Sequence, residues 1–298
     1  MAKIAIAVKH ATPGLKVRLE EGMLYFREAG YEIGVEEEKV DRLVHFVCVL
    51  SKKGAAPDRE TAGLFRRFLA ESLTSFILQE QIAPYLDELL SHYYFYFPRP
   101  ERREILSFAQ RNYADRQEKN AGGQVYSEVQ NSLRDFLFEN SYINLHGFIV
   151  FRLRFWLELL RKSLDKAVDD FLMEKEYQEF IKLLKYFVAL QEPKINQVHV
   201  TLDEDGHIQL LNQEYKALEH VEQGIEWDGA DGSSDEEDQL VSLLITVAPY
   251  RVVLHKRVFT MFPKAADTLK HVFENRVTLC KQCKLCQNMN KHVTHKGK

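Results

Sequence analysis

The sequence lacks the short motifs that mark the commonest catalytic folds. It contains no G-x-x-x-x-G-K-[ST] loop, no G-x-G-x-x-G after a strand, no H-E-x-x-H and no G-x-S-x-G. These absences argue against a P-loop nucleotide enzyme, a dinucleotide-binding dehydrogenase, a zincin protease and a serine hydrolase of the usual type. The absence of these motifs does not exclude an unfamiliar active site. It does lead us to expect a non-enzyme more than an enzyme.

Long apolar runs are also missing. The run from Ile4 to Val8 is too short for the apolar core of a secretion signal, and Lys9 ends it. Nothing approaches the ~18 apolar residues needed to span a bilayer. We therefore expect a cytoplasmic protein without a membrane span.

Cysteine is scarce, with 4 in 298 residues, and a chain of this length can bury a core without disulfides. Its hydrophobic fraction of 45% and charged fraction of 28% are ordinary for a globular protein. The net charge of -4 argues against a protein coated in positive charge for DNA.

The order of apolar patterns predicts an α+β protein with three regions. Residues 1–55 are predicted to form a small α/β unit, with strands at 2–8, 31–35 and 43–50 and a helix at 14–29. Residues 56–193 are predicted to be helical. Their clearest helices are expected at 145–173 and 177–190, and Pro193 ends the second one.

Residues 194–298 are predicted to form a second α/β unit. The alternation of Val198, Val200 and Leu202, followed by Asp205-Gly206, indicates a β-hairpin. Helices at 238–247 and 263–275 and strands at 252–254 and 277–279 follow. The β-α-β order at this end predicts a parallel pair of strands with a right-handed crossover.

Charge is unevenly distributed in this last region. An acidic loop, residues 222–238, holds eight acids and no Lys or Arg, whereas a basic tail, residues 276–298, holds six Lys or Arg and no acid. The two segments are predicted to attract each other or to face partners.

The best candidate site is the C-x2-C-x2-C run of Cys280, Cys283 and Cys286 in the basic tail. Tetrahedral zinc takes four thiolate or imidazole ligands, so we predict a metal site of these three cysteines with His292, or alternatively His295, as the fourth ligand. The alternatives are an iron–sulfur cluster, a redox dithiol and three idle thiols.

Other chemically capable residues are expected to be structural. The aromatic run 92–97 and the arginines after it are typical of nucleic-acid binding, but a helix end packed into the core is favoured. Those arginines are Arg99, Arg102 and Arg103. Cys48 is expected in the core, and His199 and His207 are expected on the surface of the hairpin.

Several stretches resemble the YtxC-like family of sporulation proteins. They are Gly147–Leu153, Phe171–Tyr177, Phe180–Val188, Gln191–Ile195, Leu243–Pro249 and Arg276–Cys286. The resemblance implies a cytoplasmic, sporulation-associated protein of endospore-forming Firmicutes. It carries over no catalytic residue.

Three hypotheses of function follow. The first is a non-catalytic interaction or regulatory protein of sporulation with protein partners. The second is a metal or iron–sulfur protein with a redox or sensing activity. The third is a nucleic-acid-binding protein, which would use the basic tail and the arginines at 99–103.

Overall fold

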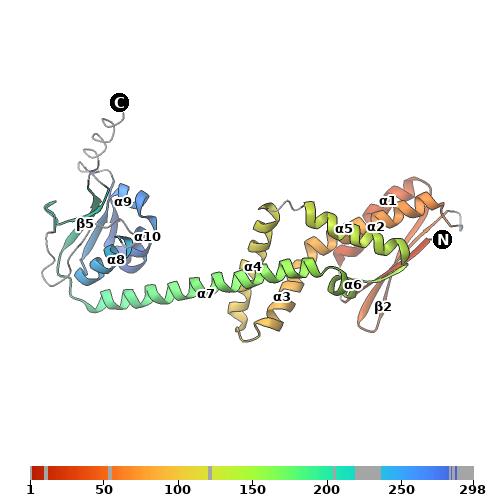
Figure 1. The fold of residues 1–298 in the computed structure, drawn as a ribbon, viewed down its shortest axis with the longest axis horizontal. Coiled ribbons are helices and arrows are strands. Elements are labelled where there is room, and N and C mark those ends of the chain that lie inside the picture. Colours follow the sequence, from red (N-terminus) through yellow and green to blue (C-terminus); the bar gives the residue numbers. More distant parts are fainter. Residues whose placement is uncertain are drawn as a thin grey trace, which may run out of the picture. The chain divides into compact units, whose positions relative to one another are not determined.

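A computed structural model describes residues 2–9, 13–52, 56–119, 123–203, 206–218, 236–281, 283 and 286 (Figure 1). The chain divides into two compact units, Met1–Met173 and Glu174–Lys298. Strands begin the first unit, helices dominate the middle of the chain, and a second sheet lies in the last part. The predicted α+β class is confirmed.

The first unit is built on a four-stranded sheet in the order β2-β3-β1-β4. Its strands are β1 (Ala2–Val8), β2 (Glu32–Val40), β3 (Leu43–Ser51) and β4 (Tyr142–Asn144). β1 pairs antiparallel with β3 and parallel with β4, so the sheet joins segments far apart in sequence. Burial alternates along β3, and Cys48 is fully buried as predicted.

The remaining elements of this unit are helices: α1 (Pro13–Glu28), α2 (Arg59–Glu80), α3 (Ile82–Tyr93), α4 (Arg99–Lys119), α5 (Gly123–Glu139), α6 (Leu145–Arg152) and the first part of α7 (Arg154–Leu190). α1 and α2 lie side by side (Figure 1). Together with the strands they enclose one core, and its largest fully buried side chain is that of Trp156.

The predicted helix boundaries in residues 145–190 were wrong. The break falls at Leu153, between α6 and α7, and α7 continues through residues 174–176. Glu174, Lys175 and Glu176 are good helix formers, so nothing local ends the helix there. Leu153 is itself fully buried, so the apolar stripe runs across the break and does not reveal it.

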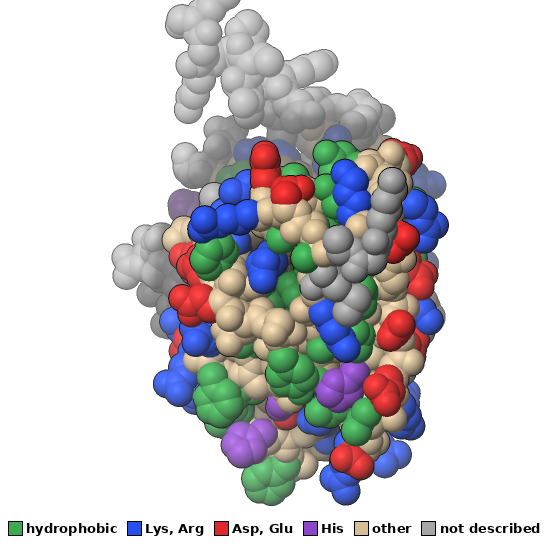
Figure 2. Space-filling view, turned by 90° about the vertical axis from the view of Figure 1, so that its right-hand side faces the viewer, with side chains coloured by type: hydrophobic (Ala, Val, Ile, Leu, Met, Phe, Trp, Pro, Cys, Tyr) green, Lys and Arg blue, Asp and Glu red, His purple; other side chains and the backbone are tan. Residues whose placement is uncertain are grey.

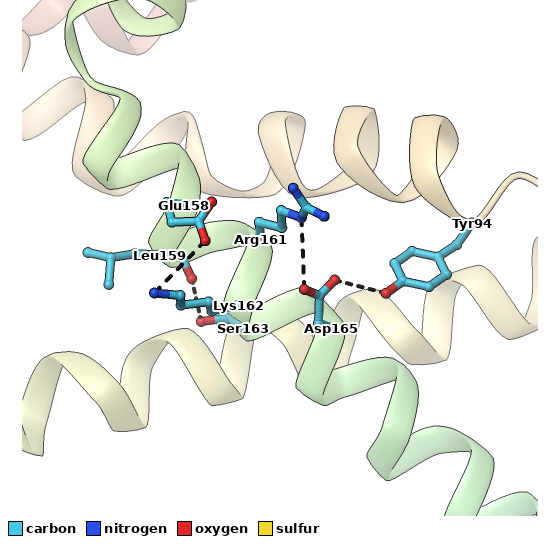
Figure 3. Close-up of polar contacts among 7 residues, drawn as sticks. All are labelled: Tyr94, Glu158, Leu159, Arg161, Lys162, Ser163 and Asp165. Carbon is cyan, nitrogen blue, oxygen red and sulfur yellow. Dashed lines mark hydrogen bonds and ion pairs between the residues drawn. The ribbon is translucent and has the colours of Figure 1, made fainter.

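The aromatic run 92–97 begins in the last turn of α3 and contains both buried and exposed rings. Tyr94 donates from its hydroxyl to Asp165 Oδ1 on α7 at 2.8 Å (Figure 3). Phe97 is buried. Phe95 and Tyr96 are exposed at 75% and 62%. The predicted packing of this helix end into the core is therefore confirmed for two of its rings.

Polar contacts along α7 support the same region. Asp165 also pairs with Arg161, and Glu158 pairs with Lys162, each at 3.9 Å and four residues apart (Figure 3). The face of the first unit in Figure 2 shows basic and acidic side chains interspersed. The described side chains on this face therefore form no one-sided basic patch of the kind that nucleic-acid-binding proteins present.

The second unit is built on a four-stranded sheet in the order β6-β5-β7-β8. Its elements after α7 are β5 (Gln197–Leu202), β6 (Ile208–Leu211), α8 (Glu236–Val247), β7 (Arg251–Leu254), α9 (Lys256–Met261), α10 (Pro263–Phe273), the 3-10 turn η1 (Glu274–Arg276) and β8 (Val277–Leu279). β5 and β6 form the predicted antiparallel hairpin, and Gly206 supplies the positive φ of 97° in its turn. β7 and β8 form the predicted parallel pair.

One face of this sheet packs on helices. Val198, Val200, Val252 and Leu254 are fully buried in a core shared with α8, α10 and the last part of α7. Residues of odd number on β5 and β7 point to the opposite face, because side chains alternate along a strand. That second face carries His199.

Within the described ranges, no helix is long and apolar enough to cross a bilayer.

A buried hydrogen bond gives a stability test for the first unit. Trp156 Nε1 donates to the hydroxyl of Tyr113 at 3.0 Å, and both residues are buried. Tyr113→Phe leaves the indole N–H without this partner, so we expect a loss of about 1–3 kcal/mol in the free energy of unfolding. Urea denaturation measures it. Tyr93→Phe, at an exposed tyrosine, is the control, and equal midpoints for the two variants would contradict the assignment.

Candidate metal centre

The candidate site lies at the carboxyl ends of two parallel strands. His255 directly follows β7, and Cys280 directly follows β8. The backbone N–H of Cys280 donates to the carbonyl oxygen of Leu254 at 2.9 Å, which extends the ladder between these strands by one bond. Because parallel strands end at the same edge of a sheet, His255 and Cys280 become neighbours although 25 positions separate them.

His255 is held from the other side by β5. Its backbone N–H donates to the carbonyl oxygen of Val200 at 3.0 Å. His255 is also the residue directly before α9. The side chain is 1% exposed. A buried imidazole needs polar partners for both ring nitrogens, and the structure provides them.

Nδ1 of His255 faces the cysteines. It lies 3.1 Å from Cys286 Sγ and 3.6 Å from Cys283 Sγ. Cys286 Sγ lies 3.9 Å from the sulfur atoms of both Cys280 and Cys283. The N–H of Cys283 donates to Cys280 Sγ at 3.3 Å. All four ligand atoms lie within 4.8 Å of one another.

These distances match the edges of a tetrahedron around one ion. Zinc bonds of about 2.3 Å to sulfur and about 2.0–2.1 Å to nitrogen give edges of about 3.5–3.8 Å. Of the four separations given above, three are at or slightly above this range, and the His255–Cys286 edge must open by roughly 0.4 Å at a zinc ion with those bond lengths. The residues therefore fit a single tetrahedral ion.

The structure brings together the three predicted cysteines and adds a histidine that the sequence did not single out. His292 and His295 lie outside the described residues, as do most of the basic tail and residues 222–235 of the acidic loop. The part of His292 in the site stays a prediction. Among the described residues, His255 supplies the fourth ligand atom.

A second histidine, His199, contacts the ring of His255 on the side away from the cysteines. His199 Nδ1 lies 3.1 Å from His255 Nε2, and Gln197 Nε2 lies 2.7 Å from His199 Nε2. The ring of Tyr215 covers His199, with ring centroids 4.6 Å apart. His199 is 4% exposed, so its predicted surface position was wrong. The ring of Tyr215 in the loop after β6, together with Gln197 and His255, covers this side chain.

This covering loop has its own internal support. Asn212 Oδ1 accepts hydrogen bonds from the backbone N–H groups of Glu214 and Lys216, as Asn side chains do in tight turns. Tyr215 adopts a positive φ of 60°, which turns the chain at this point. The loop thereby holds the tyrosine ring against His199.

Burial governs the electrostatics of the site. It lowers the pKa of His199 and of His255, and the neighbouring charge of His199 lowers that of His255 further. Both rings are therefore neutral at pH 7, the form that binds metals. Burial, followed by the thiols of Cys280 and Cys283, raises the pKa of Cys286. A metal ion must displace protons from such thiols.

The histidine pKa shifts predict a pH dependence of stability. Both pKa values are lowered in the folded protein, whereas an unfolded chain titrates near about 6.5. The unfolded chain therefore takes up more protons below that pH. We expect the free energy of unfolding of the metal-free protein to fall as the pH drops from about 7.5 to about 5.5.

Urea denaturation in the presence of a chelator, followed by circular dichroism, measures this change. The double variant His199→Asn, His255→Asn is the matched control, and its stability should depend less on pH over the same interval. A slope in the wild type that is equal to or smaller than that of the double variant would contradict the assignment.

Comparisons with known proteins place the chain in a family. The sequence model of the YtxC-like family matches residues 67–278, which is most of the chain. The chain is also 25% identical over 224 residues to the "Uncharacterized protein YtxC" of Bacillus subtilis (strain 168), covering 72% of this chain and 76% of the relative. No solved structure matches it. The family match begins in α2 and ends in β8, and on this evidence the chain belongs to the YtxC-like family.

Proposed function

We propose that the second unit binds one zinc ion through His255, Cys280, Cys283 and Cys286, and that this ion has a structural role. The observation that carries the proposal is the mutual approach of the four ligand atoms within 4.8 Å. Three sulfur atoms and one imidazole nitrogen in this arrangement suit zinc above the other common divalent ions.

The geometry disfavours an iron–sulfur cluster, and the electrostatics disfavour a redox dithiol. An iron–sulfur cluster spreads its protein ligands over two or more iron atoms, so these ligands span a wider cage than four atoms within 4.8 Å of one another. A redox dithiol needs a thiolate at neutral pH. Burial and the neighbouring thiols raise the pKa of Cys286, which favours its protonated thiol over the thiolate.

A structural role follows from the number of ligands. Catalytic zinc keeps one coordination position open for water or substrate, whereas a site with four protein ligands is closed. An ion here joins the residue after β7 to the segment after β8, and it would hold this segment onto the sheet. We therefore favour a non-catalytic protein whose zinc shapes a surface for protein partners.

Metal analysis tests the proposal. We expect about one zinc and no iron per chain after purification under reducing conditions, and loss of the zinc from Cys280→Ser, Cys286→Ser and His255→Ala. Cys48→Ala is the matched cysteine control because Cys48 lies in the first unit. His271→Ala is the histidine control, because this exposed ring contacts Asp267 on its own helix.

The outcomes separate the alternatives. Iron together with acid-labile sulfide, in place of zinc, would establish the cluster hypothesis. Wild-type protein with less than about a tenth of an equivalent of either metal would refute both metal hypotheses. Full zinc in His255→Ala, with loss in His292→Ala, would restore the ligand set predicted from sequence.

The sporulation role is a further part of this proposal, and the family resemblance supports it. If zinc organises the partner surface, Cys280→Ser and Cys286→Ser should lower spore yield in the native host as strongly as deletion of the gene. Heat-resistant spore counts measure this, with immunoblots to check that protein levels are equal. Normal spore counts in the deletion strain would contradict the role in sporulation.

A further inference from the structure

The second histidine of the site has no place in the set of four ligands. His199 is 4% exposed, lies on β5, and contacts His255 on the side away from the cysteines. Strand pairing sets this contact, because β5 and β7 run parallel with Val200 opposite Leu254. His199 and His255 therefore project from adjacent strands onto one face of the sheet.

The four groups form a line of polar contacts. Gln197 Nε2 lies 2.7 Å from His199 Nε2, His199 Nδ1 lies 3.1 Å from His255 Nε2, and His255 Nδ1 lies 3.1 Å from Cys286 Sγ. A neutral imidazole carries one proton on one of its two nitrogens. Placing one proton therefore decides the direction of every hydrogen bond along the line.

The metal needs one of the two possible directions. His255 can bind an ion through Nδ1 only when this nitrogen carries no proton, so its proton must be on Nε2. Nε2–H then donates to His199 Nδ1, and the proton of His199 is on Nε2. That proton can be accepted by Oε1 of Gln197 once the side-chain amide turns by 180°, an exchange of two nearly isosteric groups.

We propose that His199 is a positioning residue of the metal centre, which accepts a hydrogen bond from His255 Nε2 and so keeps Nδ1 available for the ion. The inference rests on the proposed zinc site. Ligating histidines commonly use their second nitrogen in this way, with a carboxylate, a carbonyl or water as the partner. Here the partner is a second imidazole, itself held by Gln197 and covered by Tyr215.

Two substitutions distinguish the effect of the acceptor nitrogen of His199 from the effect of its ring. His199→Phe keeps a ring beneath Tyr215 but removes the acceptor nitrogen. His199→Asn removes the ring but places an amide oxygen close to the position of Nδ1. His207→Phe is the matched control, because His207 belongs to the same hairpin and lies beyond the pair Leu202–Ile208, at the opposite end from His199.

Zinc affinity is measured on the full chain by competition with a chromophoric chelator. We expect His199→Phe to bind zinc about 10–100-fold more weakly than wild type. His199→Asn should recover most of the affinity, and His207→Phe should match wild type. Cobalt absorption spectra of the same variants report whether three sulfurs and one nitrogen still bind the ion.

Nitrogen-15 NMR of the wild-type zinc form tests the proton positions directly, even if a variant fails to fold. We expect a proton on Nε2 of His255 that exchanges slowly with water, and an unprotonated Nδ1 on His199. A protonated Nδ1 on His199, or equal affinities of His199→Phe and wild type, would overturn the inference while leaving the zinc site intact. A wild-type protein that binds no zinc would overturn both.

Discussion

The site depends on the parallel pairing at the end of the second sheet. One backbone hydrogen bond, from the N–H of Cys280 to the carbonyl of Leu254, fixes the end of β8 against the end of β7. A second, from the N–H of His255 to the carbonyl of Val200, fixes β7 against β5. Both bonds are made by the backbone and need no particular side chain, so any residues at these positions would be neighbours. The sequence supplies a thiol at one and an imidazole at the other.

This dependence explains why the thiols and the imidazoles reach the site differently. The cysteines lie three residues apart in sequence, so their sulfur atoms need no strand pairing to meet, and the N–H of Cys283 donates to Cys280 Sγ. The histidines are 56 positions apart and meet only because their strands are paired. A local cluster of cysteines thus gains its fourth candidate ligand from the edge of a sheet. We infer that the sheet must form before the full ligand set exists, and that metal binding then couples to the folding of the second unit.

Much of the fold was predictable because its signals are local. The hairpin of β5 and β6, the helix before β8 and the parallel order of β7 and β8 follow from alternation, a turn glycine and the β-α-β order. The break at Leu153 was not predictable, since an apolar stripe runs through it. The short strand β4 was also missed. Three residues are too few to show a period, and β4 exists because β1 offers an edge.

For the site, the sequence held a signal that was not used. The parallel pair 252–254 and 277–279 was predicted, and parallel strands end at one edge, so the residues that follow them, His255 and Cys280, should have been expected to meet. His199 is a different case. Its alternation with buried Val198 and Val200 places it on the face away from the helices, which is ordinarily exposed to water. There the ring of Tyr215, from the loop after β6, and the side chains of Gln197 and His255 surround the histidine and bury it. The position of His255 beside Cys280 was therefore within reach of topology alone, whereas the burial of His199 depends on contacts that form only in three dimensions.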